Sequence, residues 1–341
     1  MSCELIVHRA GPGTTVQDMG RPGYLAFGLS RGGAADRLAL AEGAVLLGRS
    51  EELPALEMAG MGGEFEVTED VCIALTGAPM AASVDGVRLS WNASHLLRAG
   101  KRLTIGAVTS GVYGYLHLGG GFALPPQLGA QSAHLAAGIG KPVTPGERLP
   151  VGVDKSSTTG MKLSADARFD GGSIRVVPSL QTSHFAADEI ARFQSTAFHR
   201  DNRGNRMGVR MVPEGDGFHT EAGLNILSEV IVPGDIQITG DGTPFVLLSE
   251  CQTTGGYPRI GSVLPCDLPR VAQAGPGTTL RFKFVPLEEA VAIEQRDTVA
   301  RRDLRRKVQP LIRDPHDIAD LLSYQLISGV TAGEDLDRSQ W

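Results

Sequence analysis

The sequence predicts a mainly β fold built as two related halves, and three observations lead to that prediction. First, the 341-residue chain contains 44 Gly and 20 Pro but only 5% aromatic residues. This composition is typical of many turns and few long helices. Second, short segments rich in Val, Ile, Leu or Thr recur between Gly and Pro residues, as strands do. Third, one series of such segments occurs twice in the same order.

The clearest strand candidates are short apolar segments bounded by Gly or Pro. They lie at 71–76, 102–105, 112–118, 173–177, 235–239, 244–248 and 279–284. They do not alternate regularly with helical patterns, so a parallel doubly wound sheet is disfavoured.

Helical patterns are fewer, at 36–47, 186–198, 287–306 and 317–327. Asp36 is of the type that caps a helix N-terminus, and Gly48 is placed to end the first helix. Proline precedes the last two segments, as it often does at the start of a helix.

The repeated series gives the domain organisation. Segments 56–60, 63–68 and 72–76 correspond, near an offset of 171, to segments 227–231, 234–239 and 246–248. We therefore expect one β-barrel-like half at 1–170, a second at 171–285, and a C-terminal helical extension at 286–341. The largest cleft of such a protein lies between the halves, where binding sites tend to form.

The overall charge argues against two classes of partner. The chain has 32 Lys and Arg against 38 Asp and Glu, a formal net charge of −6. This balance gives no general attraction to nucleic acid or to an anionic membrane. The basic cluster at 301–307 contains Asp303 and is interpreted as a solvated helix face. No apolar run reaches the roughly 18 residues that a membrane span needs.

Cysteine usage indicates the compartment. Cys3, Cys72, Cys251 and Cys266 lie far apart with no CxxC pair, so four free thiols in a reducing cytoplasm are the simplest interpretation. Spacings typical of a zinc site are missing from the sequence. The N-terminus lacks the basic start and long apolar core of a signal peptide. A cytoplasmic protein without a metal site is expected.

Two glycine-containing motifs bear on the chemistry. No standard phosphate-binding loop occurs, because Gly138-Ile139-Gly140-Lys141 is followed by Pro142. The segment 28–32 matches GxSxG with Ser30 at its centre, the outline of a nucleophile elbow. The alternating architecture that carries such an elbow is missing, and no His or Asp stands out as its partner, so a serine hydrolase is disfavoured.

The densest polar cluster spans 14–24 and contains Gln17, Asp18 and Arg21 beside glycines. Glycine allows close approach of a ligand, Arg can grip a carboxylate or phosphate, and Asp can orient water. The alternative is a polar turn in which Asp18 and Arg21 pair with each other.

A second polar cluster spans 252–258 and contains Gln252, Thr253 and the Gly255-Gly256 step. Its amide, hydroxyls and backbone could donate to a carbonyl or phosphoryl oxygen. The alternative is a hydrogen-bonded hairpin loop. A third polar stretch, at 202–208, is less specific.

These clusters carry a resemblance to a known family. The segments 11–24 and 33–36, with Leu56-Glu57, Asn205-Arg206-Met207-Gly208, 233–237 and 252–258, resemble the biotin-dependent carboxyltransferase, or allophanate hydrolase subunit 2, family. The matches span roughly residues 5 to 285 in the family's order. One departure is Gly129-Ala130-Gln131-Ser132-Ala133, where relatives often have Gly-Ser-Arg-Ser-Thr, so an arginine that could bind an anion is missing.

The resemblance implies two cyclophilin-like β-barrel halves and a role in a complex. The family includes the C subunits of ATP-dependent 5-oxoprolinases, each of which acts on a small lactam together with a B and an A subunit. The leading expectation is this ATP-using, cytoplasmic activity. The alternatives are transfer of a carboxyl group from carboxybiotin to urea or a similar amide, and a non-catalytic regulatory role toward the B subunit. The sequence has no biotin-attachment Met-Lys-Met.

The expected site residues follow from the clusters and the matched motifs. Catalytic roles are predicted for Gln17, Asp18, Arg21, Gln252 and Thr253. Substrate-binding roles are predicted for Gly23, Tyr24, Asp36, Glu57, Asn205, Arg206, Gln237, Gly255, Gly256 and Tyr257.

Overall fold

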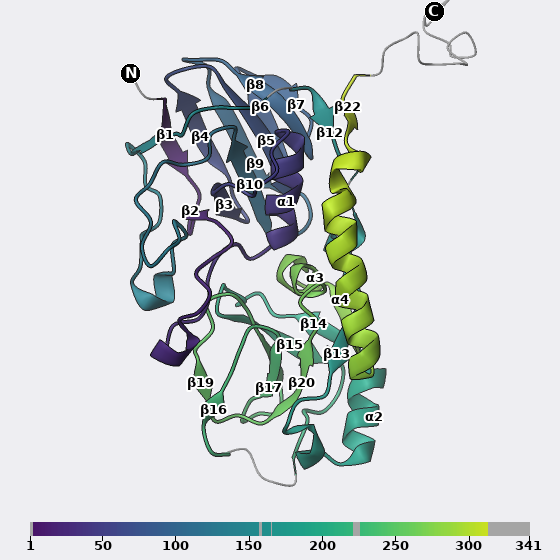
Figure 1. Cartoon of the computed structure of the whole chain (residues 1–341). Helices are drawn as coiled ribbons and strands as arrows, with labels where there is room; N and C mark the ends of the chain where they lie inside the picture. Colours follow the sequence, from purple (N-terminus) through teal and green to yellow (C-terminus); the bar gives the residue numbers. More distant parts are fainter. Residues whose placement is uncertain (1–2, 157–158, 165, 221–225, 313–341) are drawn as a thin grey trace, which may run out of the picture.

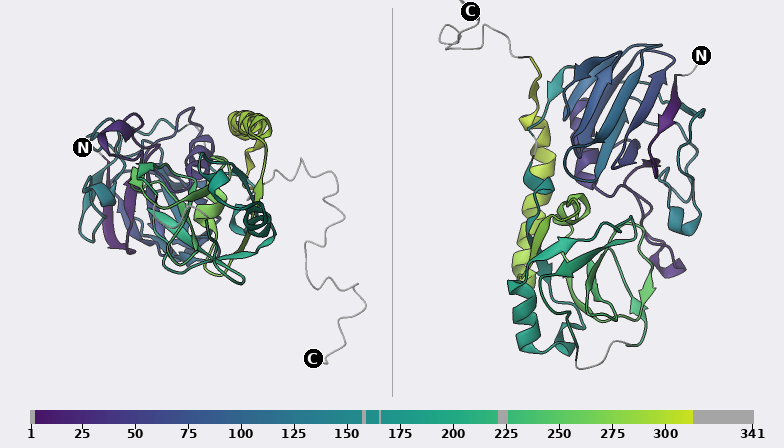
Figure 2. Two further views of the ribbon diagram at one scale, coloured as in Figure 1. Left: turned by 90° about the horizontal axis from the view of Figure 1, so that it is seen from below. Right: turned by 180° about the vertical axis from the view of Figure 1, so that it is seen from behind.

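The computed structural model describes residues 3–156, 159–164, 166–220 and 226–312. It confirms the predicted mainly β fold class, with two β-rich halves stacked end to end and one long helix lying alongside both (Figure 1). The rear view in Figure 2 shows the same arrangement. The helix predicted at 317–327 lies outside the described residues.

The first half consists of two antiparallel sheets. Among the described residues, one sheet has the order β11 (Arg148–Pro150), β1 (Glu4–Ala10), β4 (Gly63–Val67), β9 (Leu103–Val108), β6 (Met80–Val84) and β7 (Val87–Leu89). The other has the order β2 (Thr15–Gln17), β3 (Ala55–Ala59), β10 (Tyr113–Leu118), β5 (Val71–Gly77), β8 (Ala93–Leu97), β12 (Met161–Lys162) and β22 (Gln309–Pro310). Phe65 and Leu103 of the first sheet and Ile73 and Leu116 of the second share one buried cluster, so the sheets pack face to face.

The second half is a closed barrel. Its described strands follow the order β13 (Gly172–Val177), β20 (Arg259–Val263), β17 (Asp235–Ile238), β18 (Pro244–Leu247), β15 (Gly208–Pro213), β14 (Phe198–Arg200) and β21 (Thr279–Phe284). A separate ribbon pairs β16 (Glu229–Val230) with β19 (Thr254–Gly255). Buried phenylalanines lie in its core, and Phe193 lies 5.1 to 5.4 Å, centroid to centroid, from Phe198, Phe218 and Phe282. Tilted, edge-on and stacked ring pairs at such distances stabilise the core beyond their buried area.

The helices connect and cover the sheets. They are α1 (Arg37–Leu46), α2 (Ala187–Ser195), α3 (Leu268–Gln273) and α4 (Leu287–Arg302), with 3-10 turns η1 (Leu25–Phe27), η2 (Leu135–Ala137), η3 (Ala167–Phe169), η4 (Thr182–His184) and η5 (Asp303–Lys307). Asp36 caps α1 as predicted, its carboxylate accepting from the Ala39 N–H. The segment predicted as one helix at 287–306 divides into α4 and η5. The described helices include none long and apolar enough to cross a membrane.

A glycine fixes how closely α1 approaches its sheet. A Cβ atom at Gly43 would lie 2.3 Å from the ring of His117 on β10. No real side chain fits at that distance, so glycine is required for α1 to rest on the sheet.

All seven predicted strands form, as β5, β9, β10, β13, β17, β18 and β21. The repeated series also appears as strands in the same order, β3-β4-β5 and β16-β17-β18. The pairing differs between the copies. In the first, β4 and β5 belong to opposite sheets, whereas β17 and β18 pair directly with each other in the second.

The two halves share a continuous interior. One buried cluster contains Leu40 and Tyr115 of the first half together with Val271, Ile236 and Phe282 of the second. Burial of apolar surface therefore stabilises the junction itself.

Candidate functional site

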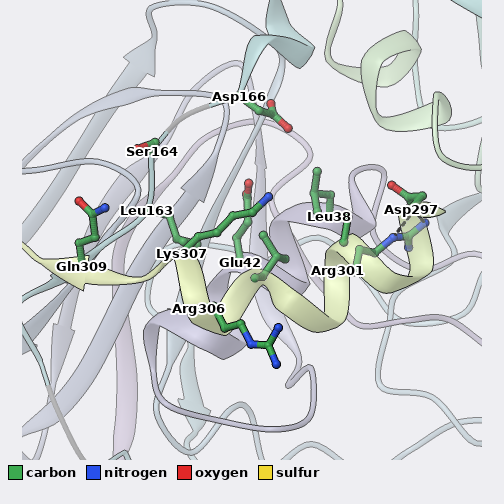
Figure 3. Close-up of a pocket in the computed structure, with 12 residues that line it drawn as sticks. Leu38, Glu42, Leu163, Ser164, Asp166, Asp297, Arg301, Arg306, Lys307 and Gln309 are labelled. Carbon is green, nitrogen blue, oxygen red and sulfur yellow. Dashed lines mark hydrogen bonds and ion pairs between the residues drawn. The ribbon is translucent and has the colours of Figure 1, made fainter.

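The cavities differ in whether residues of the predicted polar clusters line them. One cavity of about 560 Å³ lies between α1 and the C-terminal α4–η5 segment (Figure 3). It is lined by Glu42, Asp297, Arg301 and Lys307 among others, and by no residue of the predicted clusters. A second cavity, of about 460 Å³, lies at the junction and is lined by residues of both halves. Its lining comes from 28–30, His134, Ala136, Ala137, Met207 and 250–254.

The junction cavity contains a buried serine–histidine pair. The Ser30 Oγ lies 2.8 Å from the Nε2 of His134, and both side chains belong to residues only 3% exposed. Ser30 lies in the loop between η1 and α1. The sequence offered no partner for this GxSxG serine, and the structure supplies one from 104 residues away.

The other ring nitrogen of His134 has two polar neighbours. Its Nδ1 lies 3.3 Å from the Ala137 nitrogen and 4.0 Å from the Oε2 of Glu250. If Nδ1 is unprotonated, it accepts from Ala137 and Nε2 donates to Ser30. If Nδ1 is protonated, it faces Glu250 and Nε2 can accept the hydroxyl proton of Ser30. Burial lowers the pKa of His134, and the negative charge of Glu250 partly opposes that shift. A neutral imidazole with two available tautomers can accept or donate a proton in this cavity.

Tight crossing of two loops places Ser30. The Arg21 N–H donates to the Arg31 carbonyl over 2.8 Å, and the Ala34 N–H donates to the Asp18 carbonyl over 2.9 Å. At Gly33, with φ +81°, a Cβ atom would lie 2.6 Å from the Gly20 nitrogen. Glycine at this position therefore lets the loops touch.

The predicted catalytic residues of the 14–24 cluster hold the loop that carries His134. The Gln17 Nε2 donates to the Ala133 carbonyl over 3.1 Å, and Asp18 accepts from the Gln131 N–H over 2.6 Å. The Arg21 guanidinium donates to the Ser132 carbonyl. Asp18 and Arg21 form no ion pair with each other in the described structure, so the alternative of a simple paired turn is wrong.

Two polar atoms of the 14–24 cluster lack hydrogen-bond partners among the described residues. The Oε1 of Gln17 and the Nη1 of Arg21 are buried without a hydrogen-bond partner among the described residues. Burial lowers the pKa of Arg21, although Asp18 and Glu250 oppose the shift. Gly23 and Tyr24 lie outside the junction cavity. The Tyr24 ring packs at a tilt against exposed Phe27, with centroids 6.3 Å apart.

A buried ion-pair network crosses the junction beside the cavity. Arg206 pairs with Glu57 of the first half and, over 2.6 Å, with Glu250 of the second. It also donates to the Gly33 carbonyl over 2.6 Å. Because all these groups are buried, each depends on the others for its partners.

The network continues toward α1. The hydroxyl of Tyr115 donates to Glu57 over 2.7 Å and accepts from the Asp36 N–H over 2.8 Å. The Asp36 carboxylate in turn accepts from Arg168 over 2.8 Å and from Gln273 over 2.9 Å. Glu57, Asp36 and Arg206, predicted to bind substrate, thus have protein partners that join the halves.

The remaining predicted residues divide between the cavity and other places. Gln252 and Thr253 line the cavity, and Gln252 is exposed. Gln237 is buried on β17 next to the β16–β19 ribbon, and its Nε2 has no hydrogen-bond partner among the described residues. Tyr257 is 43% exposed, and Asn205 accepts from the Met207 N–H in a turn.

The glycine step behind Gln252 contributes backbone geometry. At Gly255, on β19, a Cβ atom would lie 2.6 Å from the Nε2 of Gln237. The Gly256 carbonyl accepts from the Ile226 N–H over 3.1 Å. The structure therefore brings Gln252 and Thr253 to Ser30 and His134 and leaves Gly255 and Gly256 in the neighbouring ribbon.

No role was predicted from the sequence for His134. None was predicted either for Glu250, which lies just before the second polar cluster at 252–258. The GxSxG motif was the usable signal for Ser30. Within the described residues, no group of three or more His, Cys, Asp or Glu is arranged to hold a metal ion.

Comparison with known proteins places the chain in a family. Residues 27–284 match the family model described as the carboxyltransferase domain, subdomain A and B. The chain belongs to this family. The resemblance seen in its motifs is thereby confirmed.

Two similar proteins are C subunits of 5-oxoprolinase, that of Haemophilus influenzae, 32% identical, and that of Escherichia coli, 34% identical. The alignments cover 86% and 85% of this chain and 95% and 94% of those proteins. The urea amidolyase of Saccharomyces cerevisiae is 24% identical over 86% of this chain and 17% of its own length.

Solved structures agree with the fold. The crystal structure of TTHA0988 matches with a TM-score of 0.75 and 29% identity over 83% of this chain, and the chain spans 56% of the length of that protein. The Kluyveromyces lactis urea amidolyase matches with a TM-score of 0.78 and 22% identity over 92% of this chain and 21% of its own.

Proposed function

We propose that this chain is the C subunit of an ATP-dependent 5-oxoprolinase. The complex would convert 5-oxo-L-proline, ATP and water into L-glutamate, ADP and phosphate. The observation that carries the proposal is the similarity, over nearly their whole length, to two proteins named as C subunits of 5-oxoprolinase. The serine–histidine cavity at the junction supplies groups suited to the hydrolytic half of that reaction.

The reaction proceeds in three steps. The lactam carbonyl oxygen receives a phosphoryl group from ATP, which makes the carbonyl carbon electrophilic. Water then attacks that carbon, and the ring C–N bond breaks with a proton going to nitrogen, which leaves an acyl phosphate. A second water hydrolyses the acyl phosphate, so that phosphate leaves and the carboxylate of glutamate forms. ATP use is assigned to the complex as a whole.

Roles for residues of this chain follow from their places. His134, held by Ser30 and near Glu250, accepts the proton of the attacking water, as a neutral imidazole can. Gln252 and Thr253 donate to the oxygen on which negative charge develops. Gln17, Asp18 and Arg21 act as positioning residues, since they fix the 127–134 loop behind His134.

The proposal includes partners and a compartment. As a C subunit, the chain would work in the cytoplasm with the B and A subunits of the enzyme, which would complete the site for the small lactam. The exposed Gln252 loop and the exposed Phe27 on the neighbouring turn lie where a partner could cover the cavity.

The test is a Ser30→Ala chain carried through to activity. Tagged wild-type and variant chains are recovered from their native cells with their partners, which mass spectrometry identifies, and ATP-dependent glutamate formation is measured. We expect Ser30→Ala to retain the partners and lose at least tenfold in turnover. The control is Ser195→Ala, at the exposed end of α2. Full activity in Ser30→Ala would remove the pair from the mechanism, and a complex inactive on 5-oxoproline in both proteins would reject the function.

Carboxyl transfer is the second candidate, favoured by the family description and the urea amidolyase relatives. It requires a carrier of carboxybiotin from another protein. A streptavidin blot of the same recovered complex separates the two, because a biotinylated partner would indicate carboxyl transfer to a urea-like amide.

A further inference from the structure

A second, smaller cavity lies at the junction on the side of α1. It has a volume of about 240 Å³ and lies where the N-terminus of α1, the start of α3 and the 248–249 segment meet. Figure 1 shows α1 and α3 adjacent at the junction, with α4 beside them. The apolar part of its lining consists of Ala34, Ala35, Pro233, Leu248, Pro265, Leu268 and Pro269.

This cavity is separate from the serine–histidine cavity. The Gly32 N–H donates to the Ser249 carbonyl over 3.0 Å. This bond joins two segments whose residues divide between the cavities, with Ser30 and Glu250 on one side and Arg31 and Ser249 on the other. A ligand of the smaller cavity therefore meets a different set of groups.

Three arginines line the smaller cavity. Arg301 has an acidic partner, Asp297, at 2.5 Å. Arg31 and Arg37 donate only to backbone carbonyls, of Met19 over 2.9 Å and of Gly32 over 3.3 Å, and form no ion pair with a described residue. Burial, followed by the charges of Arg31 and Arg301, lowers the pKa of Arg37 to about 10. Two guanidinium charges thus lie together without a carboxylate.

One residue that lines the cavity has a polar group without a partner in the described structure. Ser249 is 7% exposed, and its Oγ is buried with no hydrogen-bond partner among the described residues. Buried hydroxyls are normally hydrogen-bonded, so a missing partner needs an explanation. Arg37 is the first residue of the ten-residue helix α1, whose N-terminal end adds positive potential.

We propose that this cavity binds a small carboxylate with a compact apolar body. The carboxylate is held by Arg37 and Arg31 and accepts from the Ser249 hydroxyl, while the body packs on the prolines and leucines of the wall. Such a ligand satisfies the unpaired hydroxyl and neutralises the guanidinium charge. At about 240 Å³ the cavity is below the size of pockets for drug-sized ligands. Free phosphate would leave the apolar wall uncovered.

The test is calorimetric titration of the full chain with cyclopentanecarboxylate. Matched titrations use cyclopentylmethanol, which keeps the ring without the charge, and inorganic phosphate, which keeps charge without the ring. We expect the carboxylate to bind at least tenfold more tightly than either. Equal or tighter binding of the alcohol or of phosphate would overturn the proposal, as would no binding of the carboxylate.

Variants locate the binding. Arg37→Gln should weaken carboxylate binding at least tenfold, and Ser249→Ala, a smaller change that keeps the charges, should weaken it about threefold to tenfold. Arg302→Gln is the control, because this exposed arginine does not line the cavity. Unchanged binding in folded Arg37→Gln and Ser249→Ala proteins would reject the site.

Two further titrations, with 5-oxo-L-proline and with L-glutamate, test whether the natural ligand is the substrate or the product of the proposed reaction. Binding of either one that is lost in Arg37→Gln links the cavity to the proposed reaction. Binding of cyclopentanecarboxylate alone assigns the cavity to another small carboxylate. The proposal does not depend on turnover, so it can succeed where the 5-oxoprolinase assignment fails.

Discussion

Two buried histidine–hydroxyl pairs in this protein have nearly the same geometry and different surroundings. The Nε2 of His117 lies 2.7 Å from the Thr76 hydroxyl, and the Nε2 of His134 lies 2.8 Å from the Ser30 hydroxyl. The Thr76 hydroxyl donates to the Ala39 carbonyl over 2.9 Å, so its single proton is committed and His117 must donate to it. The Ser30 hydroxyl has no second hydrogen bond to a described residue.

The difference separates a pair that is fixed in one tautomer from a pair whose proton has two places. His117 packs under α1 against Gly43, in a single tautomer, away from the described cavities. His134 lines a cavity, and each of its tautomers has a partner in Ala137 or Glu250. The distance within the pair is nearly the same in both, and the freedom of the proton distinguishes them.

The largest expected effect contrasts the two histidines directly. In the recovered complex, His134→Gln should reduce glutamate formation by at least about 100-fold, the range attributed to a general base. His117→Gln should leave turnover of the folded complex within about threefold. Steady-state kinetics of both, with folding checked by circular dichroism, make the comparison. Equal losses in the two variants would mean that the pairs do not differ in role.

The next effect concerns the network that holds Glu250 beside His134. Arg206→Ala leaves the buried carboxylates of Glu57 and Glu250 without their cation. Loss of one partner from a buried pair costs about 3 to 5 kcal/mol of unfolding free energy. Urea denaturation measures this, with Arg203→Ala as control, since that arginine is 73% exposed. A loss below about 1 kcal/mol would show that the junction does not depend on the network.

A smaller effect is the pH dependence of stability from His117. Burial lowers its pKa from 6.5 to about 3. The unfolded chain binds a proton below pH 6.5 and the folded chain does not, so stability is full above pH 6.5 and falls as the pH drops toward 3. Between pH 6.5 and 5 this histidine should cost about 2 kcal/mol. His117→Gln should flatten the measured dependence by up to one proton, and an unchanged slope would contradict a buried neutral ring.

The smallest effect falls on the exposed part of the junction cavity. Gln252→Ala should change the unfolding free energy by less than about 0.5 kcal/mol, because the residue is exposed. Turnover in the complex should fall about tenfold if its amide donates to the reacting oxygen. Thermal melting and kinetics on the same samples separate the two. A stability loss without a kinetic one would indicate a structural loop.

Much of the fold follows from local patterns. In the strand β4, buried and half-buried residues alternate from Gly63 to Val67. The strand β17 lies between two glycine turns. The alternation and the flanking glycines allowed both strands to be predicted from the sequence. How these strands pair is a non-local matter. The same three-strand series yields two facing sheets in one half and a closed barrel in the other, because the partners come from distant parts of the chain.

The site shows the same division. The polar loops around Asp18 and Gln252 were recognisable one at a time from their residue types. That His134 meets Ser30, or that Gln273 reaches Asp36 across 237 residues, depends on the packed junction. Arg206 was predicted as a ligand-binding residue through the motif that it shares with the family. Its burial between Glu57 and Glu250 depends on the packed junction and could not be read from that motif.

The short strand β22, at Gln309–Pro310, pairs with β12 at the edge of the seven-stranded sheet. This last described strand of the chain thus completes a sheet whose other members lie before residue 163. During synthesis, the first half emerges from the ribosome early but keeps an unpaired edge until the barrel and α4 have also been made. The sheet of the first half therefore gains its last described strand only after the second half has been synthesised.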